Sequence, residues 1–344
     1  MLIGPLSSRP VPSLLLALIL AAPLASAACQ QGAETTPPAE SKRKRADRPG
    51  DSSVDLEALS RELARSYSAL SDGDLEAAAA VFHPDVIWHV RTVTTQEVRG
   101  REALAAYFRA RRTADSRDVG LARVFAGGDD LLIAQGRFVD HNGSRQRVTG
   151  FVAFARVEDG QLVEVTEHLA PAQVDTTDPR LPGDPEFIHD DSDAVRQTMA
   201  ETLDDAWSSN DWGRIDNMFA PEFAYHNLGA GVEATGLKAY REVFERRAAP
   251  FPDMSFEIVN SWSTGDWVIL EKRVRGTHTV AFGELAPTMR SIEFMAVDVL
   301  RFSDDVIGEL WSYYDPLAIE TQLRAPAPSA PAQDDDEDDE DDEE

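Results

Sequence analysis

Hydrophobic residues repeat at helical spacing in two separate stretches of the chain. Apolar side chains fall three or four positions apart within residues 56–70 and again within residues 195–206. This spacing predicts two amphipathic helices, each with one buried stripe. Polar residues at 71–74 and 208–211 interrupt both patterns, and a second short helix is expected after each interruption.

The segments that follow these helices change to strand character. β-Branched and aromatic residues predominate, and turns rich in glycine and aspartate separate the segments. The expected strands cover residues 131–139, 147–157 and 162–168 in the first half, and 256–259, 267–274, 291–302 and 306–314 in the second. Helices followed by a meandering sheet are typical of an α+β fold and not of an alternating α/β fold.

The two halves are copies of one unit. Residues 82–89 align without gaps on 219–226 at an offset of 137, residues 100–108 on 236–244 at an offset of 136, and residues 159–171 on 304–316 at an offset of 145. A third helix is expected after the glycine that opens the middle segment of each copy. The repeat predicts two domains, residues 54–175 and 193–324, joined by a proline-containing linker over residues 176–192.

The N-terminal region predicts export. Residues 1–28 combine a weakly basic start, an apolar run from Leu14 to Leu24 and a small-residue cleavage region, as in a signal peptide. Cys29 follows at once and is the only cysteine, which indicates lipidation at this thiol; the alternative is ordinary cleavage near Ala27. The expected location is the cell envelope, with a lipid anchor to the membrane. Residues 29–53 have the composition of a disordered tether.

The C-terminal residues 325–344 begin with an Ala-Pro repeat and end in eleven consecutive acids, which predicts a disordered acidic tail. The formal net charge of the chain is −28, and 17 negative charges remain without these eleven acids. An acidic domain surface excludes nucleic acid as the expected partner, because phosphates require Lys and Arg.

Motifs for cofactors and metals are absent from the sequence. There is no GxxxxGK[ST], HExxH or CxxC pattern, and the seven histidines occur singly. We therefore expect neither a cofactor nor a metal ion.

The second copy carries a recognisable signature. The segment 275–279 (Arg-Gly-Thr-His-Thr), residues 286–288 (Ala-Pro-Thr) and residues 309–315 (Glu-Leu-Trp-Ser-Tyr-Tyr-Asp) resemble the second half of a SnoaL-like domain. This family is the polyketide-cyclase branch of the nuclear transport factor 2-like superfamily. The resemblance implies two tandem cone-shaped domains, in which a strongly curved antiparallel sheet packs on helices and leaves an apolar cavity for a small molecule. The first copy lacks the Gly-Thr-His motif and is degenerate.

Asp315 is the candidate general base. Strand alternation puts Glu309, Trp311, Tyr313 and Asp315 on one face, and burial among aromatic residues raises the pKa of a carboxyl toward the range useful for a base. The resemblance implies the same role, because an aspartate after the tryptophan of the closing strand is the base of SnoaL-like cyclases. The alternative is that Asp315, followed by a proline, only caps the strand end and begins a turn.

Partners for Asp315 are expected around the same cavity. The resemblance implies His226 as a second catalytic residue at the cavity entry, with His278, Tyr225, Asn227, Trp311 and Phe294 as substrate-binding residues. An imidazole or phenol there could donate a hydrogen bond to an enolate oxygen. Structural roles are the alternative for His226 and His278, and a core position for Trp311.

The alignment limits chemistry to the second copy, because Thr166 and Ala170 replace Trp311 and Asp315 in the first. One hypothesis is cofactor-independent cyclase or isomerase chemistry at a carbon next to a carbonyl. The alternatives are a non-catalytic protein that binds a small apolar molecule and an interaction scaffold of the envelope. We also expect the two domains to pack on each other as an intrachain pseudo-dimer.

Overall fold

A computed structural model describes residues 54–92, 95–111, 116–171 and 181–325. The predicted signal peptide, Cys29, the predicted tether and nearly all of the acidic tail lie outside the described residues. Among the described residues, no helix is long and apolar enough to cross a membrane.

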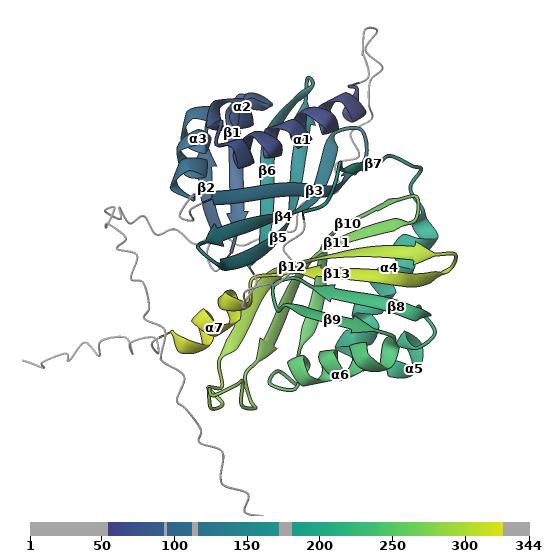
Figure 1. Cartoon of the computed structure of the whole chain (residues 1–344). Helices are drawn as coiled ribbons and strands as arrows, with labels where there is room; N and C mark the ends of the chain where they lie inside the picture. The colour runs from purple at the N-terminus through teal and green to yellow at the C-terminus, as the bar shows by residue number, and fades with distance from the viewer. Residues whose placement is uncertain (1–53, 93–94, 112–115, 172–180, 326–344) are drawn as a thin grey trace, which may run out of the picture. The chain divides into compact units, whose positions relative to one another are not determined.

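The first domain packs three helices on one face of a curved sheet (Figure 1). The helices are α1 (Leu56–Asp72), α2 (Leu75–Ala80) and α3 (Arg101–Ala110). The strands are β1 (Phe82–Arg91), β2 (Thr95–Arg99), β3 (Ser116–Ala126), β4 (Leu131–Asn142), β5 (Arg145–Glu158) and β6 (Gln161–Pro171). A short strand in the linker, β7 (Glu186–Ile188), joins the edge of this sheet beside β3, so the sheet order is β2-β1-β6-β5-β4-β3-β7.

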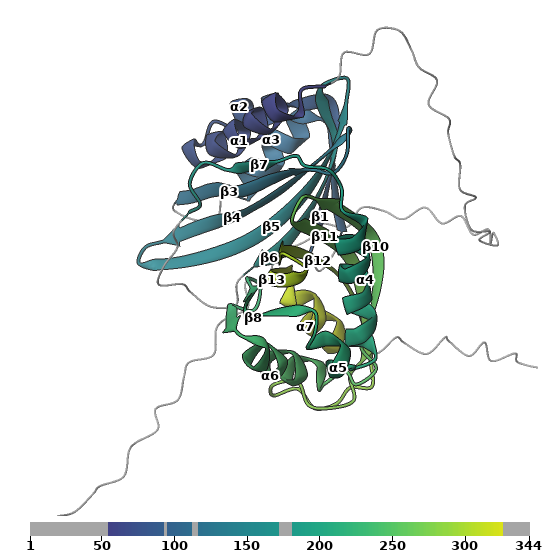
Figure 2. The ribbon, with the colours of Figure 1, turned by 90° about the vertical axis from the view of Figure 1, so that its right-hand side faces the viewer.

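The second domain repeats this arrangement (Figure 2). Its helices are α4 (Ala194–Ser208), α5 (Trp212–Ile215), α6 (Leu237–Ala248) and α7 (Pro316–Arg324). Its strands are β8 (Phe219–Asn227), β9 (Val232–Thr235), β10 (Ser255–Thr264), β11 (Trp267–Thr277), β12 (Ser291–Ser303) and β13 (Val306–Tyr313). The sheet order β10-β11-β12-β13-β8-β9 is that of the first domain without β7.

Strand registers confirm the repeat. Trp88 of β1 pairs with Val165 of β6, and Tyr225 of β8 pairs with Leu310 of β13, both in parallel. These two pairs are related by the offsets of 137 and 145 found in the sequence. Both domains also carry a bulge at the same place, in β3 after Leu121 and in β10 after Ile258. Positions in the two domains can therefore be compared residue by residue.

Each domain begins with helices whose ends follow local chemistry. Asp55 caps α1 by accepting a hydrogen bond from Ala58 N, and Asp193 caps α4 by accepting from Val195 N and Arg196 N. The second helices are short, as expected, because the chain already enters β1 at Phe82 and β8 at Phe219. The sequence analysis also missed helix α7 and the strands β1, β2, β3, β7, β8 and β9.

Each domain has its own apolar core between helices and sheet. A further apolar cluster contains residues of both domains, including Phe125, Ile133, Trp267 and Ile269. Hydrogen bonds also join the domains: His168 Nε2 and Glu271 Oε1 lie 2.9 Å apart, and Gln135 Nε2 lies 2.9 Å from the Tyr313 hydroxyl. These contacts do not establish a twofold relation between the domains, so the pseudo-dimer stays a prediction.

Candidate functional site in the second domain

The second domain holds a cavity of about 140 Å³ between α4, α6, α7 and the helix-facing side of the sheet. Nine of its twenty lining residues are aromatic, among them Trp207, Tyr240, Phe244, Phe251, Phe256 and Phe282. Such a wall suits a small apolar molecule, and the few polar groups that interrupt it would decide how that molecule is oriented.

The main polar feature is a buried lysine between two carboxylates. Lys272 Nζ, on β11, donates to Asp204 Oδ1 of α4 at 2.8 Å and to Asp298 Oδ2 of β12 at 2.5 Å. None of the three residues is more than 3% exposed. Lys272 and Asp298 line the cavity, together with Ser312, whose Oγ donates to Asp298 Oδ1 at 2.6 Å. We call Asp204, Lys272 and Asp298 the buried triad.

Aromatic packing holds the lysine of this triad in place. The ammonium of Lys272 lies 4.6 Å from the ring centre of Trp207 and 4.8 Å from that of Phe256. Ring faces attract a cation, so these contacts add to the two carboxylates in keeping the ammonium charged in an apolar environment.

Burial and the shared ammonium set the ionisation of the triad. Burial raises the pKa of Asp204 to about 6, the ammonium of Lys272 opposes this rise, and the negative charge of Asp298 adds to it. One oxygen of Asp204, Oδ2, is buried with no hydrogen-bond partner among the described residues. Burial alone would lower the pKa of Lys272, but the two carboxylates outweigh it and hold that pKa well above its usual value. The triad therefore keeps its cation, and Asp204 is the member whose protonated form burial favours.

A second polar group in the cavity is a short hydrogen-bonded chain. Asn227 Nδ2 donates to the Tyr225 hydroxyl at 2.8 Å and lies 3.5 Å from the Tyr314 hydroxyl. Burial raises the pKa of Tyr225, while Arg247 and the hydrogen bond from Asn227 oppose the rise and the charge of Asp298 adds to it. Tyr225 is thus a neutral phenol close to both Arg247 and Asp298, and it can donate its proton in a hydrogen bond.

Arg247, in the last turn of α6, also lines the cavity. Its Nη1 is buried and has no hydrogen-bond partner among the described residues, and its guanidinium lies over the Tyr314 ring at 4.9 Å. Burial lowers the pKa of Arg247, with the charge of Arg246 acting in the same direction.

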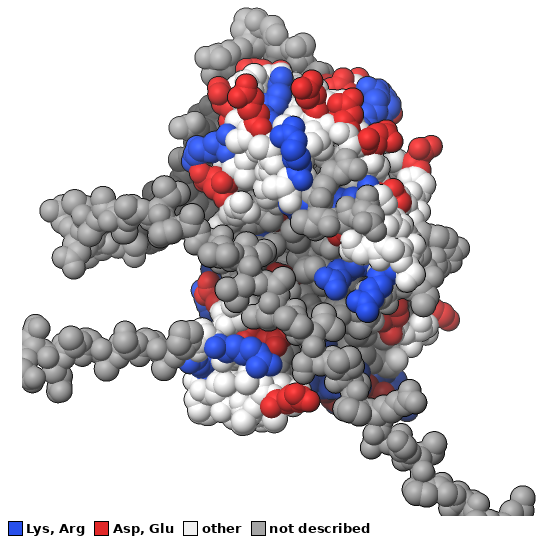
Figure 3. Space-filling view, turned by 60° about the vertical axis from the view of Figure 1, so that its left-hand side comes forward, with Lys and Arg blue, Asp and Glu red and all other residues white. Residues whose placement is uncertain are grey.

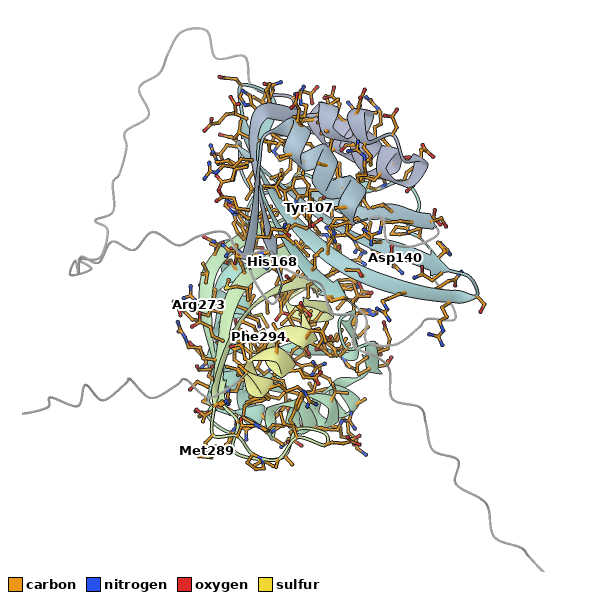
Figure 4. All side chains as sticks on the ribbon, turned by 90° about the vertical axis from the view of Figure 1, so that its left-hand side faces the viewer. Tyr107, Asp140, His168, Arg273, Met289 and Phe294 are labelled. Atoms are coloured by element: carbon orange, nitrogen blue, oxygen red, sulfur yellow. The ribbon has the colours of Figure 1, made fainter. Side chains whose placement is uncertain are left out.

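Three of the substrate-binding residues expected from the sequence do line this cavity, namely Tyr225, Asn227 and Phe294. Phe294 lies beside α7 (Figure 4), with its ring 5.4 Å from that of Tyr314. Their role in binding a substrate stays a prediction.

Asp315 is not where the sequence analysis placed it. The residue follows the end of β13 and is the N-cap of α7, with its Oδ1 accepting a hydrogen bond from Leu317 N at 3.0 Å and Pro316 in the first turn. The strand face that carries Trp311 and Tyr313 looks away from the cavity, and Ser312 and Tyr314 supply the cavity wall instead. Asp315 therefore caps a helix, whereas the alternative in the sequence analysis was a cap of the strand end at the start of a turn.

His226 and Trp311 also lie outside the cavity. They stack on each other at 5.1 Å, and His226 Nδ1 lies 2.5 Å from Glu233 Oε2. Trp311 stacks in turn on Trp267 within the cluster shared by the two domains. Strand alternation explains both positions, because Tyr225 and Asn227 on either side of His226 face inward.

His278 is fully buried but does not line the cavity. Its Nδ1 lies 3.0 Å from Thr288 Oγ1 and accepts a hydrogen bond from Thr288 N at 3.2 Å. The backbone of His278 pairs with Arg290 and Met289, so the Gly-Thr-His motif closes the loop of residues 278–290. Met289 lies in the loops at one end of the domain (Figure 4).

The first domain has replaced the buried triad completely. The shared strand registers place Gly136 at the position of Lys272 and Ala153 at that of Asp298. In the first helix, the offset of 137 places Tyr67 at the position of Asp204. Tyr67 stacks on Phe151 at 5.1 Å, and the hollow that remains measures only about 20 Å³.

Sequence reasoning missed the triad for identifiable reasons. Asp298 is an acid in an otherwise apolar strand centre, and this isolation was the available signal. Lys272 stands between Glu271 and Arg273, so no apolar context marks it as buried. Asp204 is one of two adjacent aspartates, and only the tertiary fold shows that its neighbour faces solvent.

Surface charge and possible metal ligands do not indicate a further functional site among the described residues. On the surface shown in Figure 3, acidic and basic side chains are interspersed without a continuous basic patch. Among the described residues, no group of three or more His, Cys, Asp or Glu side chains could hold a metal ion.

Comparison with family models assigns both domains. Residues 197–323 match the SnoaL-like polyketide cyclase model, and residues 63–165 match the SnoaL-like domain model. The chain thus carries two tandem SnoaL-like domains, and their fold is that of the α+β nuclear transport factor 2-like domains. A comparison with curated proteins found no significant match.

Solved structures similar to this chain each span about one domain of it. IdmH from Streptomyces antibioticus, a proposed polyketide cyclase, is 25% identical, covers 39% of this chain and 100% of its own, and has a TM-score of 0.36. A proposed SnoaL-like polyketide cyclase from Jannaschia sp. CCS1 is 19% identical over 40% of this chain and 98% of its own, with a TM-score of 0.37. AclR from Streptomyces galilaeus, a proposed hydroxylase, is 23% identical, covers 39% of this chain and 98% of its own, and has a TM-score of 0.35.

Proposed function

We propose that the second domain binds a small apolar carbonyl compound and moves a proton at the carbon next to the carbonyl, as a cyclase or isomerase does, without a cofactor. The observation that carries this proposal is the buried triad, because one of its carboxylates, Asp298, lines an aromatic cavity. A carboxylate in such a wall can reach a C–H bond of a bound molecule while bulk water is kept away.

Asp298 is the base in this proposal. Each of its oxygens accepts one hydrogen bond, from Lys272 or from Ser312, and a carboxylate oxygen can accept more than one. When Asp298 takes a proton, the Lys272 ammonium stays paired with Asp204, so no isolated charge is created in the cavity.

Tyr225 is the hydrogen-bond donor for the developing enolate. Its hydroxyl accepts a hydrogen bond from Asn227, lies within hydrogen-bonding reach of Ser312, and can donate its own proton to the carbonyl oxygen of the ligand. A donor fixed before the reaction stabilises the charge that develops on that oxygen. Tyr225 and Asp298 belong to different strands, β8 and β12, so one molecule between them could contact both.

The test is exchange of the C–H protons next to the carbonyl of phenylacetone and 2-tetralone in D2O, followed by mass spectrometry. We expect exchange above the buffer rate with the wild-type chain, and a loss of about 10²- to 10⁴-fold with Asp298→Asn. Asp315→Asn is the matched control, since that carboxylate caps α7 outside the cavity. Equal exchange by wild type and Asp298→Asn would contradict the assignment of the base.

Non-catalytic binding is the second candidate function. It is favoured by the hydrogen bonds that Asp298 accepts from Lys272 at 2.5 Å and from Ser312 at 2.6 Å, because both carboxylate oxygens are already engaged within the protein. Binding of these ketones with no exchange above the buffer rate would support this function.

We also propose export with a lipid anchor on Cys29, supported by the sequence of residues 1–29. Metabolic labelling with an alkyne fatty acid should mark the wild-type protein and not Cys29→Ser. Labelling of both, or of neither, would contradict the anchor.

A further inference from the structure

Arg247 and Arg111 occupy the same position in the two domains but have different surroundings. Both stand at the C-terminal end of the third helix and are related by the offset of 136: Arg111 is the C-cap of α3, and Arg247 lies in the last turn of α6. Each helix begins after a glycine, with Gly100 N bonded to Val86 O and Gly236 N bonded to Phe223 O. The two arginines therefore occupy equivalent positions, Arg111 in contact with Glu167 of β6 and Arg247 in contact with Tyr314, which follows β13.

In the first domain the guanidinium is satisfied from within the protein. Arg111 Nη1 donates to Glu167 Oε2 at 3.0 Å and to the Tyr107 hydroxyl at 2.9 Å, and Glu167 is only 1% exposed. Tyr107 lies between α3 and the sheet (Figure 4). The ring of Phe138 packs against the same guanidinium at 5.3 Å. The first domain thus supplies its own carboxylate partner, Glu167, for Arg111.

In the second domain that carboxylate is missing. Glu167 pairs across the sheet with Ala153, and the equivalent pair in the second domain is Ser312 with Asp298. Ser312 turns its hydroxyl to Asp298, and among the described residues no carboxylate pairs with Arg247. The cavity measures about 140 Å³ here against about 20 Å³ in the first domain.

We infer that the ligand of the second domain is a small monocarboxylate with an apolar body, and that its carboxylate binds Arg247 at the place that Glu167 fills in the first domain. A buried guanidinium nitrogen without an acceptor, such as Arg247 Nη1, is costly, and a planar carboxylate is the group that matches the paired donors of a guanidinium. The aromatic wall takes the apolar body. The inference rests on the proposed function only in that the same cavity binds the ligand; it does not require Asp298 to act as a base.

Binding of 3-phenylpropanoate to the full chain tests this inference, with 3-phenylpropanamide as the neutral probe of the same shape. Calorimetry at pH 7 should show the carboxylate bound at least about tenfold more tightly than the amide. Arg247→Gln should remove this preference. Arg246→Gln, which removes an exposed charge from the same helix, should keep it.

A second pair of variants guards against misfolding as an explanation. Ser312→Glu supplies to Arg247 the carboxylate that the first domain has, so it should fold and lose the preference for the carboxylate probe. Ser312→Gln adds the same bulk without charge and should retain more of the preference. If the wild-type chain binds the amide as tightly as the acid, or if Arg247→Gln keeps the preference, the inference is wrong.

The two tests fail separately. A lost carboxylate preference with intact proton exchange would overturn the monocarboxylate and leave the proposed function. A carboxylate preference that depends on Arg247, without any proton exchange, would overturn Asp298 as base and leave the binding site.

Discussion

The two domains share a sheet order and register, yet they fill the space between helices and sheet in different ways. In the first domain the cross-strand pair Gly136 and Phe151 places a large ring over a residue without a side chain. In the second domain the equivalent pair is Lys272 and Ala296, so the long side chain has moved to the other strand and carries a charge. The first arrangement fills the interior of its domain. The second leaves a cavity that is lined by aromatic residues and a few polar groups.

In each domain the two members of the pair fit each other in size. A β-carbon added to Gly136 would lie 2.6 Å from Phe151 Cζ, so the ring of Phe151 requires the glycine. Ala296 removes that ring and gives Lys272 room to reach Asp204 and Asp298. A duplicated unit can thus separate a structural domain from a binding domain through a few paired substitutions within the same backbone.

The largest expected effect comes from removing the cation that only the second domain has. Lys272→Met would leave Asp204 and Asp298 buried without their partner, which costs about 3–5 kcal/mol of unfolding free energy. Urea denaturation measures this cost, and Lys238→Met, an exposed lysine on α6, is the matched control. Replacing the whole triad by Met and two Leu residues should recover most of the loss, because no buried charge is then unpaired. A loss below 1 kcal/mol for Lys272→Met would mean that the triad is hydrated.

A smaller effect is expected from opening the first domain. Phe151→Ala removes a fully buried ring that packs on Tyr67 at 5.1 Å and Phe138 at 4.6 Å, at a cost of roughly 3–4 kcal/mol. Urea denaturation measures this loss of unfolding free energy.

The reverse change in the second domain, Ala296→Phe, should abolish ligand binding there and lower the unfolding free energy by only about 1–3 kcal/mol. If Ala296→Phe leaves ligand binding unchanged, the cavity beside Lys272 is not the binding site.

The sequence predicted the architecture better than the chemistry. The duplication was visible because helix stripes, turn residues and strand runs recur at fixed offsets, and the strand registers confirm it. The site was harder, because strand alternation predicts which residues share a face but not which face meets the cavity. The face with Trp311 was assigned inward by the family resemblance, whereas the structure turns Ser312 and Tyr314 inward and uses Trp311 in the cluster shared with the first domain.

The remaining limit lay in groups that come together only in three dimensions. Asp204, Lys272 and Asp298 are separated by more than twenty residues along the chain, and no spacing rule joins them. The role of Arg247 could not be predicted from the sequence either, because its Nη1 lacks a partner only where another strand carries no carboxylate. The repeat itself contained the signal: Tyr67, Gly136 and Ala153 stand at the triad positions in the first copy, and a full alignment of the copies would have marked those exchanges.

The smallest expected effect concerns the pH dependence that the triad gives to the second domain alone. Burial, helped by the charge of Asp298, raises the pKa of Asp204 in the folded protein to about 6, above its ordinary value of 3.8. The folded state then binds a proton more tightly than the unfolded state between these values. The resulting stability is fully present below pH 4 and is lost as the pH rises through 6.

Asp204→Asn removes this titration, so the wild type and the variant should diverge with pH. We expect the unfolding free energy of the wild type, relative to Asp204→Asn, to fall by on the order of 2 kcal/mol between pH 4.5 and pH 7. Urea denaturation at several pH values measures the difference. Tyr67→Phe, at the matching position of the first domain, should show no such slope, since neither side chain titrates in this range. A relative stability that rises with pH would show that attraction to Lys272 outweighs burial, and that Asp204 is ionised throughout.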